Sequence, residues 1–268
     1  MALPALSRHD LIEVAVGGGG WLLYTLVRGR VVGRATEAME RGLAVFHWED
    51  TLGFLWELEL QAWALSSRLL IEIWNAIYFW GHFPTILVVG VWLYFFHRHR
   101  YTLLRNTLLL SGAIALVIYG LFPTAPPRLM PQFGFVDTMA LYSRANYQAQ
   151  EVQGFVNAYA AVPSLHFGWV FALALILIWF FPKNPLVWVI GAGNAAAQMV
   201  AIVVTGNHFF FDAIVGGVVS LGGLGLALLL RQYGYPVLAR FLPQELLLHL
   251  TPPPAPLPSL RFRHVLKA

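Results

Sequence analysis

Residues 164–181 read SLHFGWVFALALILIWFF, an apolar run without Asp, Glu, Lys or Arg that ends at Pro182-Lys-Asn-Pro185. About 20 apolar residues are enough for a helix to cross a bilayer. The run is continuous rather than alternating, which favours a helix over a strand of a membrane barrel. This stretch therefore predicts a transmembrane helix with a histidine in its first turn.

Similar apolar runs lie on both sides of this stretch. They predict five more spans, at about 11–27, 66–97, 103–122, 186–204 and 208–230. Pro84 is expected to kink the long run 66–97. Charged residues make up 11% of the chain, whereas soluble domains carry roughly 25%. The expected fold class is all-α, a polytopic membrane protein with a six-transmembrane helix bundle.

The remaining segments suggest a simple domain organisation. Residues 1–33 are expected to form an N-terminal membrane anchor, because no small-residue cleavage site follows the first apolar run. Residues 34–230 form the predicted membrane domain, and residues 231–268 a cytoplasmic Pro-rich, basic tail. Within the membrane domain, residues 34–62 mix apolar and charged positions, which is typical of amphipathic helices that lie at a membrane interface.

The basic residues divide unevenly between the two ends of the predicted spans. Nine fall on one side: Arg98, Arg100, Arg105, Lys183, Arg231, Arg240, Arg261, Arg263 and Lys267. Two, Arg128 and Arg144, fall on the other. The positive-inside rule therefore places the tail in the cytoplasm and the 123–163 loop outside. One feature disagrees with the rule, because six spans also put four arginines of residues 28–41 outside.

Composition excludes several other classes of function. The chain has no cysteine, so disulfides, thiolate nucleophiles and cysteine-based metal sites are excluded. The net charge of +4 and the pI near 9.5 fit basic residues at the cytoplasmic membrane surface. No nucleic-acid partner is expected.

Four polar residues converge at one membrane face if the spans alternate in direction. His166 begins the span 164–181, and His208 and Asp212 begin the span 208–230. Arg128 lies just beyond the end of the span 103–122. Ionisable groups in membrane segments are costly and mark function by default. We therefore expect an active site at the outer face.

The types of these residues indicate phosphate chemistry. His208 and Asp212 are four residues apart, so they share one helix face. A carboxylate on one ring nitrogen leaves the other nitrogen as a directed nucleophile or base. His166 can then act as a general acid, and the planar guanidinium of Arg128 fits phosphate oxygens.

The starts of the two spans add a second expectation about anion binding. The span 164–181 follows Pro163, and Ser164 suits the first turn. The last span follows Gly206 and Asn207. Two helix N-termini are therefore expected to direct free N–H groups and positive dipole ends at one anion.

Two other readings use the same residues. Two histidines and an aspartate can bind zinc, but Arg128 nearby opposes a cation, so neither a metal nor another cofactor is expected. A proton-coupled transporter would place such groups near the midplane on broken helices. Here they cluster at the starts of helices.

Three segments resemble known motifs: Phe122-Pro-Thr-Ala-Pro-Pro-Arg128, Ala160-Ala-Val-Pro-Ser-Leu-His166 and Thr205-Gly-Asn-His-Phe-Phe-Phe-Asp212. They resemble the phosphatase motifs of the type-2 phosphatidic acid phosphatase superfamily, and most closely its inositol phosphorylceramide synthase-like branch. The resemblance covers about residues 37–217. It implies six spans, an outer-face site and no metal.

The same resemblance implies a role for each matching residue. His208 would be the nucleophile that forms a phosphohistidine, and Asp212 would orient it. His166 would protonate the leaving group. Arg128 and Ser164 would hold the phosphate of a membrane lipid.

Three positions depart from the superfamily pattern. Leu121 replaces a lysine of the first motif, Ile202 replaces an arginine of the third, and Leu165 replaces the glycine of Ser-Gly-His. Fewer cations favour a lipid phosphodiester, which carries less charge than a monoester. We therefore expect a phosphotransferase that moves a phosphoryl head group between lipids or to an alcohol such as inositol. A lipid phosphate phosphatase is the alternative.

Other polar residues are secondary candidates for head-group binding or for helix packing. Asp137, Arg144 and His82 are candidates for binding the head group. Asn194 and Gln198 are expected to make helix-packing contacts. The expected location is the plasma membrane, with the active site on its outer face.

Overall fold

The computed structural model describes residues 33–143, 158–238 and 240–241, together with isolated positions between 11 and 23. This described part is helical and contains no strand; an isolated bridge joins Thr124 to Ala160. The all-α prediction is therefore confirmed for the described residues. Most of the predicted tail, residues 242–268, and Arg144 lie outside them.

The longest connections between successive described helices are those from Leu121 to Thr138 and from Tyr142 to Leu165. The helices are α2 (Ala35–Thr51), α3 (Glu57–Leu65), α4 (Arg68–Trp80), α5 (Phe83–Phe96), α6 (Arg98–Leu121), α7 (Thr138–Tyr142), α9 (Leu165–Phe180), α10 (Pro185–Trp188), α11 (Asn194–Val204), α12 (Phe210–Leu229) and α13 (Tyr235–Leu238). Short 3₁₀ turns (Pro127–Leu129, Pro131–Phe133) precede α7, and π turns (Val189–Gly193, Leu230–Gly234) join α10 to α11 and α12 to α13.

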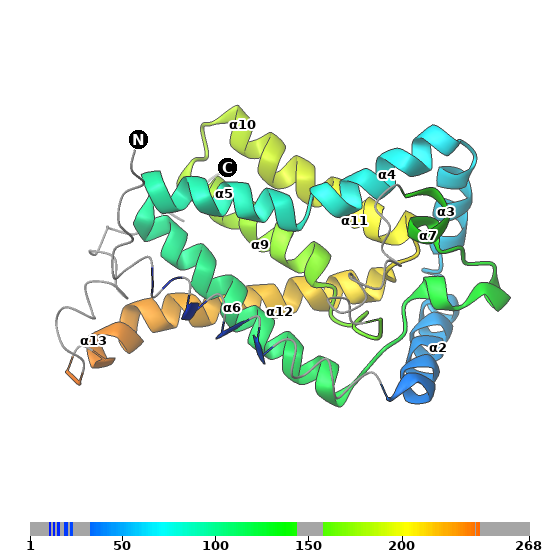
Figure 1. Ribbon diagram of the computed structural model, residues 1–268, viewed down its shortest axis with the longest axis horizontal. Coiled ribbons are helices and arrows are strands. Elements are labelled where there is room, and N and C mark those ends of the chain that lie inside the picture. The colour runs from blue at the N-terminus through cyan, green and yellow to red at the C-terminus, as the bar shows by residue number, and fades with distance from the viewer. Residues whose placement is uncertain are drawn as a thin grey trace, which may run out of the picture.

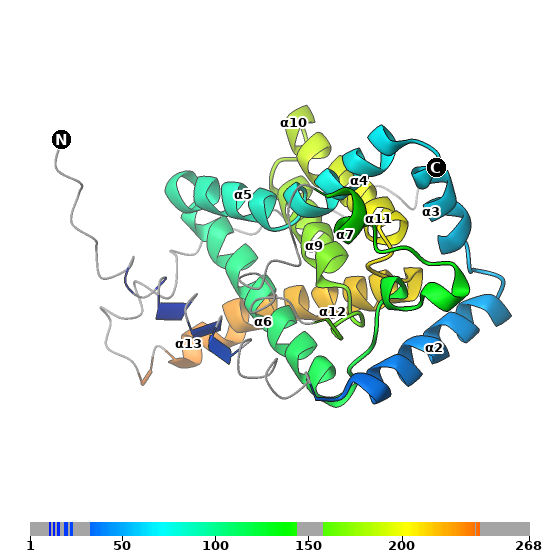
Figure 2. The ribbon, with the colours of Figure 1, turned by 45° about the vertical axis from the view of Figure 1, so that its right-hand side comes forward.

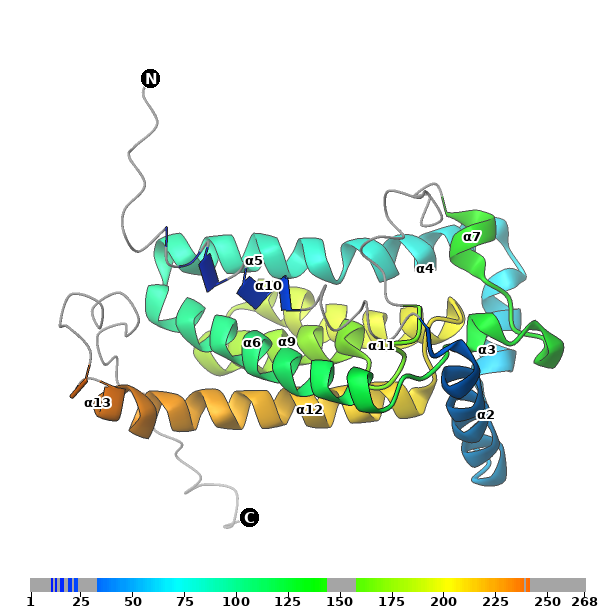
Figure 3. The ribbon, with the colours of Figure 1, turned by 60° about the horizontal axis from the view of Figure 1, so that its bottom comes forward.

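Two groups of helices divide the molecule. The long helices α4 to α6, α9, α11 and α12 run along its long axis, and α2, α3 and α7 gather at the end where α12 begins (Figures 1, 2 and 3). In Figure 3, α2 lies across that end of the bundle. The segment 34–62, for which one or two helices are predicted, thus contains α2 and most of α3, which continues to Leu65.

Three described helices are long and apolar enough to cross a membrane: Arg98–Leu121, Pro185–Val204 and Phe210–Leu238. A fourth span results if α4 and α5, bent by 40° at their junction, are taken together. The helix α9 is apolar but shorter. The last span continues to Leu238, eight residues beyond its predicted end at 230. The chain is a membrane protein.

The long run 66–97 breaks rather than kinks at Pro84. The helix ends at Gly81, and Pro84 lies in the first turn of α5, where a missing N–H costs nothing. Asn194 donates from Nδ2 to the Gly81 carbonyl at 2.7 Å, and Gln198 donates to a last-turn carbonyl of α4 at 2.9 Å. These side chains of α11 donate to carbonyls beside the break, including that of Ile77, which also accepts from the amide of Gly81. They are therefore hydrogen-bonding groups as well as packing contacts.

The helices α9 and α12 approach each other closely at two glycines. A Cβ atom on Gly216 would overlap the carbonyl of Ser164, and one on Gly168 would overlap the carbonyl of Gly216. Small residues permit such close contact between membrane helices. The contact brings the first turn of α9 against the first turns of α12.

The described positions near the N-terminus contact α6 in chain order. Glu13 forms an ion pair with Arg105 near the start of α6, and Gly20 lies beside Leu109. Arg34 donates to a carbonyl in the last turn of α6. These contacts therefore progress along α6 from its first turns to its end.

Candidate active site

The third motif begins with a tight turn between α11 and α12. Gly206 has a φ of +70°, which favours glycine. The amides of Asn207 and His208 both donate to the carbonyl of Ile202, at 3.1 and 3.0 Å. The turn therefore fixes His208 immediately before the first turn of α12.

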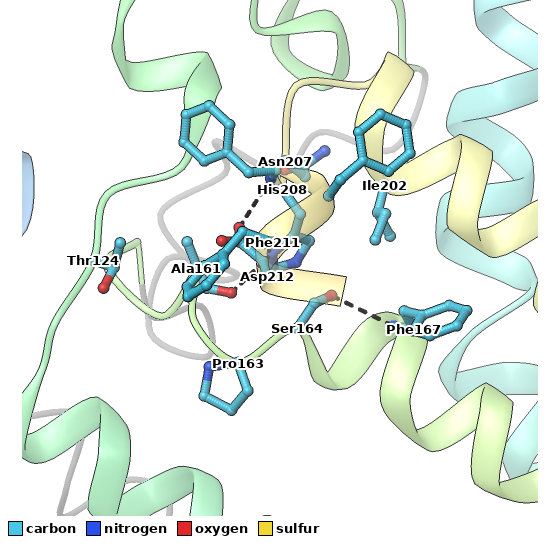
Figure 4. Close-up of polar contacts among 12 residues, drawn as sticks. Thr124, Ala161, Pro163, Ser164, Phe167, Ile202, Asn207, His208, Phe211 and Asp212 are labelled. Atoms are coloured by element: carbon cyan, nitrogen blue, oxygen red, sulfur yellow. Dashed lines mark hydrogen bonds and ion pairs between the residues drawn. The ribbon is translucent and has the colours of Figure 1, made fainter. Parts of the chain in front are cut away.

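The imidazole of His208 is held at one nitrogen. Its Nδ1 lies 3.0 Å from the carbonyl oxygen of Ala161 and 3.2 Å from Oδ2 of Asp212 (Figure 4). A carbonyl oxygen only accepts hydrogen bonds, so Nδ1 carries the proton and Nε2 keeps its lone pair. His208 and Asp212 are 5% and 0% exposed. The predicted contact between them is confirmed, and Nε2 is the ring nitrogen that keeps its lone pair.

The imidazole of His166 lies in a cluster of rings. Its centroid is 5.8 Å from that of His208, 4.2 Å from that of His82 and 4.5 Å from the stacked ring of Tyr78. His82 is buried, and its Nε2 has no hydrogen-bond partner among the described residues. Tyr78 was missed by the sequence analysis, although its spacing of four residues from His82 was a signal.

Ser164 links the second motif to the third through its backbone. Its amide donates to the carbonyl of Asp212 at 2.9 Å, and its hydroxyl caps α9 by accepting from the amide of Phe167 at 3.4 Å (Figure 4). The amide of Ala161 donates to the carbonyl of Thr124 at 3.1 Å, which ties the second motif to the first. The carbonyl that holds His208 is therefore itself fixed by the first motif.

Arg128 closes this backbone network. Its amide donates to the carbonyl of Gly206 at 2.7 Å. Its guanidinium Nε is 3.7 Å from Oδ2 of Asp137, whose other oxygen caps α7 by accepting from the amide of Ala140 at 3.0 Å. Asp137 therefore contacts Arg128 and stabilises the loop that carries it.

The N-terminus of α12 does not offer the free N–H groups that the sequence predicts. The amide of Phe209 donates to Asp212 at 3.0 Å, that of Phe210 to Glu57 at 3.0 Å, and that of Phe211 to Glu49 at 2.7 Å. This part of the prediction is wrong, because three carboxyl groups already occupy the first N–H groups. Glu49 and Glu57 are 5% and 0% exposed, although the sequence analysis grouped them with the charges of interfacial helices.

The three departures from the motif pattern leave few cations near His208. Leu121 is 59% exposed at the end of α6, and Ile202 is fully buried. Neither side chain can bind a phosphate oxygen. Within the described ranges, no group of three or more His, Cys, Asp or Glu side chains is placed to hold a metal ion.

Comparison with known proteins agrees with the three motifs. The model of the PAP2 superfamily matches residues 43–226, which is more than half of the chain and includes all three motifs. No curated protein matches the chain significantly, and no solved structure does. Members of this superfamily are phosphatases or phosphotransferases that act on lipid phosphates. The chain therefore belongs to the PAP2 superfamily and is a membrane enzyme of lipid phosphate esters.

Proposed function

We propose that the chain is a lipid phosphotransferase that works through a phosphohistidine at His208, with hydrolysis as a slower competing path. The observation that carries the proposal is the double contact of His208 Nδ1 with Ala161 and Asp212. It leaves Nε2 as the nucleophile, with the ring of His166 next to it.

The reaction has two halves that balance. In the first, Nε2 attacks the phosphorus of a phospholipid head group; an N–P bond forms while the P–O bond to the lipid alcohol breaks. His166 gives its proton to the leaving oxygen, and Asp212 stabilises the cationic imidazole. In the second half, an acceptor hydroxyl attacks the phosphorus, the N–P bond breaks, and the hydroxyl proton returns to His166.

The charges of the site favour a phosphodiester over a monoester. We assign Arg128 and the hydroxyl of Ser164 to the phosphate oxygens. The carboxylate of Asp137, 3.7 Å from Nε of Arg128, balances part of the guanidinium charge. Leu121 and Ile202 add no cation. A phosphodiester carries one negative charge, so it needs less compensation than a monoester.

The acceptor side of the reaction is assigned to His82. Its buried Nε2 is free among the described residues, and its ring lies 4.2 Å from that of His166. A free imidazole nitrogen beside the general acid is suited to bind a hydroxyl of the acceptor or head group. We also retain Asp137 and Arg144 as head-group candidates from the sequence.

We further propose six spans with the site at the outer face of the plasma membrane. The nine-to-two division of basic residues supports this orientation. The contacts that Glu13 and Arg34 each make with α6 support a first span beside that helix. Single cysteines at Gln132 and His99 test it in this cysteine-free chain. An impermeant reagent should label Gln132→Cys alone in intact cells; equal labelling of both would reject the orientation.

The experiment that tests the function measures where the phosphoryl group goes. Purified protein in vesicles receives a phospholipid labelled at phosphorus, with rising concentrations of inositol, glycerol or a lipid alcohol. We expect the transfer product to grow at the expense of the hydrolysis product. An acid-labile phosphoenzyme should form in wild type and in the control variant His47→Ala, and be absent in His208→Ala.

Two outcomes would change the proposal. If hydrolysis supplies the sole product at every acceptor concentration, the chain is a lipid phosphate phosphatase. If His208→Ala keeps full activity, the phosphohistidine mechanism is wrong.

A further inference from the structure

Two Trp-Glu dipeptides meet the first turn of α12. Trp48-Glu49 lies near the end of α2, and Trp56-Glu57 begins α3. Glu49 accepts from the amide of Phe211 at 2.7 Å, and Glu57 accepts from the amide of Phe210 at 3.0 Å. Two successive N–H groups of the catalytic helix are therefore held by carboxyl groups from two other helices.

The two tryptophans contact the same two residues of α12 through their aromatic rings. The ring of Trp48 packs edge-on against Phe211, with centroids 5.9 Å apart, and that of Trp56 packs edge-on against Phe210 at 6.3 Å. The two tryptophans are 59% and 52% exposed. Exposed tryptophans of a membrane protein are typical of the water–lipid interface. Each dipeptide thus holds one α12 residue by its backbone and its ring, and exposes its own indole.

The two glutamates are not balanced by basic side chains. Each has a buried Oε2 without a hydrogen-bond partner among the described residues, as does Oδ1 of Asp212. Burial, followed by the hydrogen bond and charge of Glu57, raises the pKa of Glu49 to about 9, and Asp212 contributes to the shift. Burial also raises the pKa of Glu57. At neutral pH, Glu49 therefore keeps its proton beside Glu57.

The titratable groups around this pair come from three elements. On α12 there is Asp212, which contacts His208 just before that helix. On α2, His47 and Asp50 are exposed neighbours of Glu49 in sequence, and on α3, Glu59 is an exposed neighbour of Glu57. A glutamine would cap the same amide without placing an ionisable group in the interior. Holding these amides therefore requires an acceptor at each position and not a charge.

We propose that Glu49 and Glu57 are positioning residues, and that the two Trp-Glu dipeptides form clamps that fix the first turn of α12. The clamps hold Asp212 against His208 and connect the exposed indoles at the membrane interface to the nucleophile. The kinetic part rests on the proposed function. Because the clamps occupy the N-terminus of α12, the phosphate depends on Arg128 and the start of α9.

The test compares alanine with glutamine at each glutamate. Glu49→Ala and Glu57→Ala leave a buried amide unpaired, and displacement of His208 should slow phosphoenzyme formation roughly 10²-fold with KM little changed. Glu49→Gln keeps an acceptor for Phe211 and should form phosphoenzyme near the wild-type rate. It should also lose less of that rate than wild type as the pH approaches 9. Asp50→Asn and Glu59→Gln, at exposed neighbouring positions, are the matched controls.

Hydrogen exchange supplies a readout that needs no substrate. The amides of Phe210 and Phe211 should exchange slowly in wild type and in Glu49→Gln, and fast at Phe211 in Glu49→Ala. Alanine variants with wild-type rates and wild-type exchange would overturn the clamps. So would glutamine variants as slow as the alanine variants. If wild type forms no phosphoenzyme, the proposed function fails, and the exchange measurement still decides the clamps.

Discussion

Buried carboxyl groups have different kinds of partner at the two ends of the helical bundle. At the end opposite the site, Glu13 pairs with Arg105, and both side chains are 10% exposed. At the site, Glu49, Glu57 and Asp212 converge, and no Lys or Arg forms an ion pair with them in the described part of the chain. Backbone amides and one imidazole hold them instead.

We interpret the Glu13–Arg105 ion pair as structural and the carboxyl groups at the site as functional. A buried ion pair cancels its own charge, so removing one partner mainly costs stability. A carboxylate held by neutral donors keeps its charge available for a cation that forms later. In the proposed mechanism, Asp212 uses this charge to stabilise His208 when its ring becomes cationic. The comparison predicts that variants of Asp212 mainly change the rate of phosphoenzyme formation. Variants of the Glu13–Arg105 pair should mainly change the free energy of unfolding.

The largest effect is expected for Asp212→Asn. The amide removes the negative charge that stabilises the cationic ring, while the carbonyl of Ala161 still accepts from Nδ1 of His208. We expect phosphoenzyme formation to fall roughly 10³–10⁴-fold, as in catalytic triads that lose their carboxylate. Rapid-quench measurement of the phosphoenzyme checks this.

Glu13→Gln is the control from the opposite end of the bundle. It should change the rate little, because Glu13 contacts Arg105 and Tyr101 and not the site. A rate loss as large as that of Asp212→Asn would break the distinction between the two ends.

The second prediction concerns the close contact between α9 and α12 at Gly216. In Gly216→Ala the new methyl group meets the backbone of Ser164, so the second and third motifs must move apart. We expect about a 10²-fold lower rate and a loss of about 1–3 kcal/mol of unfolding free energy. Gly222→Ala and Gly225→Ala on the same helix are controls, because nothing lies within 4 Å of the added Cβ. Equal effects at all three positions would contradict the proposed contact.

The convergence of the motifs was predictable because it needs little tertiary information. Hydropathy locates the helices, and their alternation brings His166, His208 and Asp212 to one end. The His208–Asp212 contact follows from a spacing of four residues. The inference used local periodicity and chain direction, which are both encoded within short segments.

The occupied N-terminus of α12 was not predictable in the same way. Its partners Glu49 and Glu57 lie 162 and 153 residues away in sequence, on helices whose charges fit a solvated face equally well. The break at Gly81 was missed for the same reason, since α11 supplies the groups that stabilise it. Buried hydrogen bonds between distant segments leave no periodic pattern.

The third prediction concerns the ion pair at the far end. Arg105→Gln removes the positive charge that pairs with the nearly buried Glu13. We expect a loss on the order of 3 kcal/mol of unfolding free energy with little change in rate. The double variant Glu13→Gln/Arg105→Gln should recover part of that loss, as measured by thermal unfolding in detergent. No recovery would show that the pair does not act as a unit.

The last prediction uses pH to compare the two ends. The pKa of Glu49 is raised from its usual value of 4.5 to about 9 in the folded protein. Between these values the folded chain holds a proton that the unfolded chain has lost, so stability falls as pH rises and levels off above 9. The slope is at most about 1.4 kcal/mol per pH unit for one proton.

Glu49→Gln has no such proton, so its melting temperature should rise relative to wild type as pH increases through this window. The double variant Glu13→Gln/Arg105→Gln, which lacks both charges of the far-end pair, should keep a constant offset from wild type over the same window. A constant offset for Glu49→Gln would mean that Glu49 is ionised in the folded protein, and the contrast between the two ends would then lie in their partners alone.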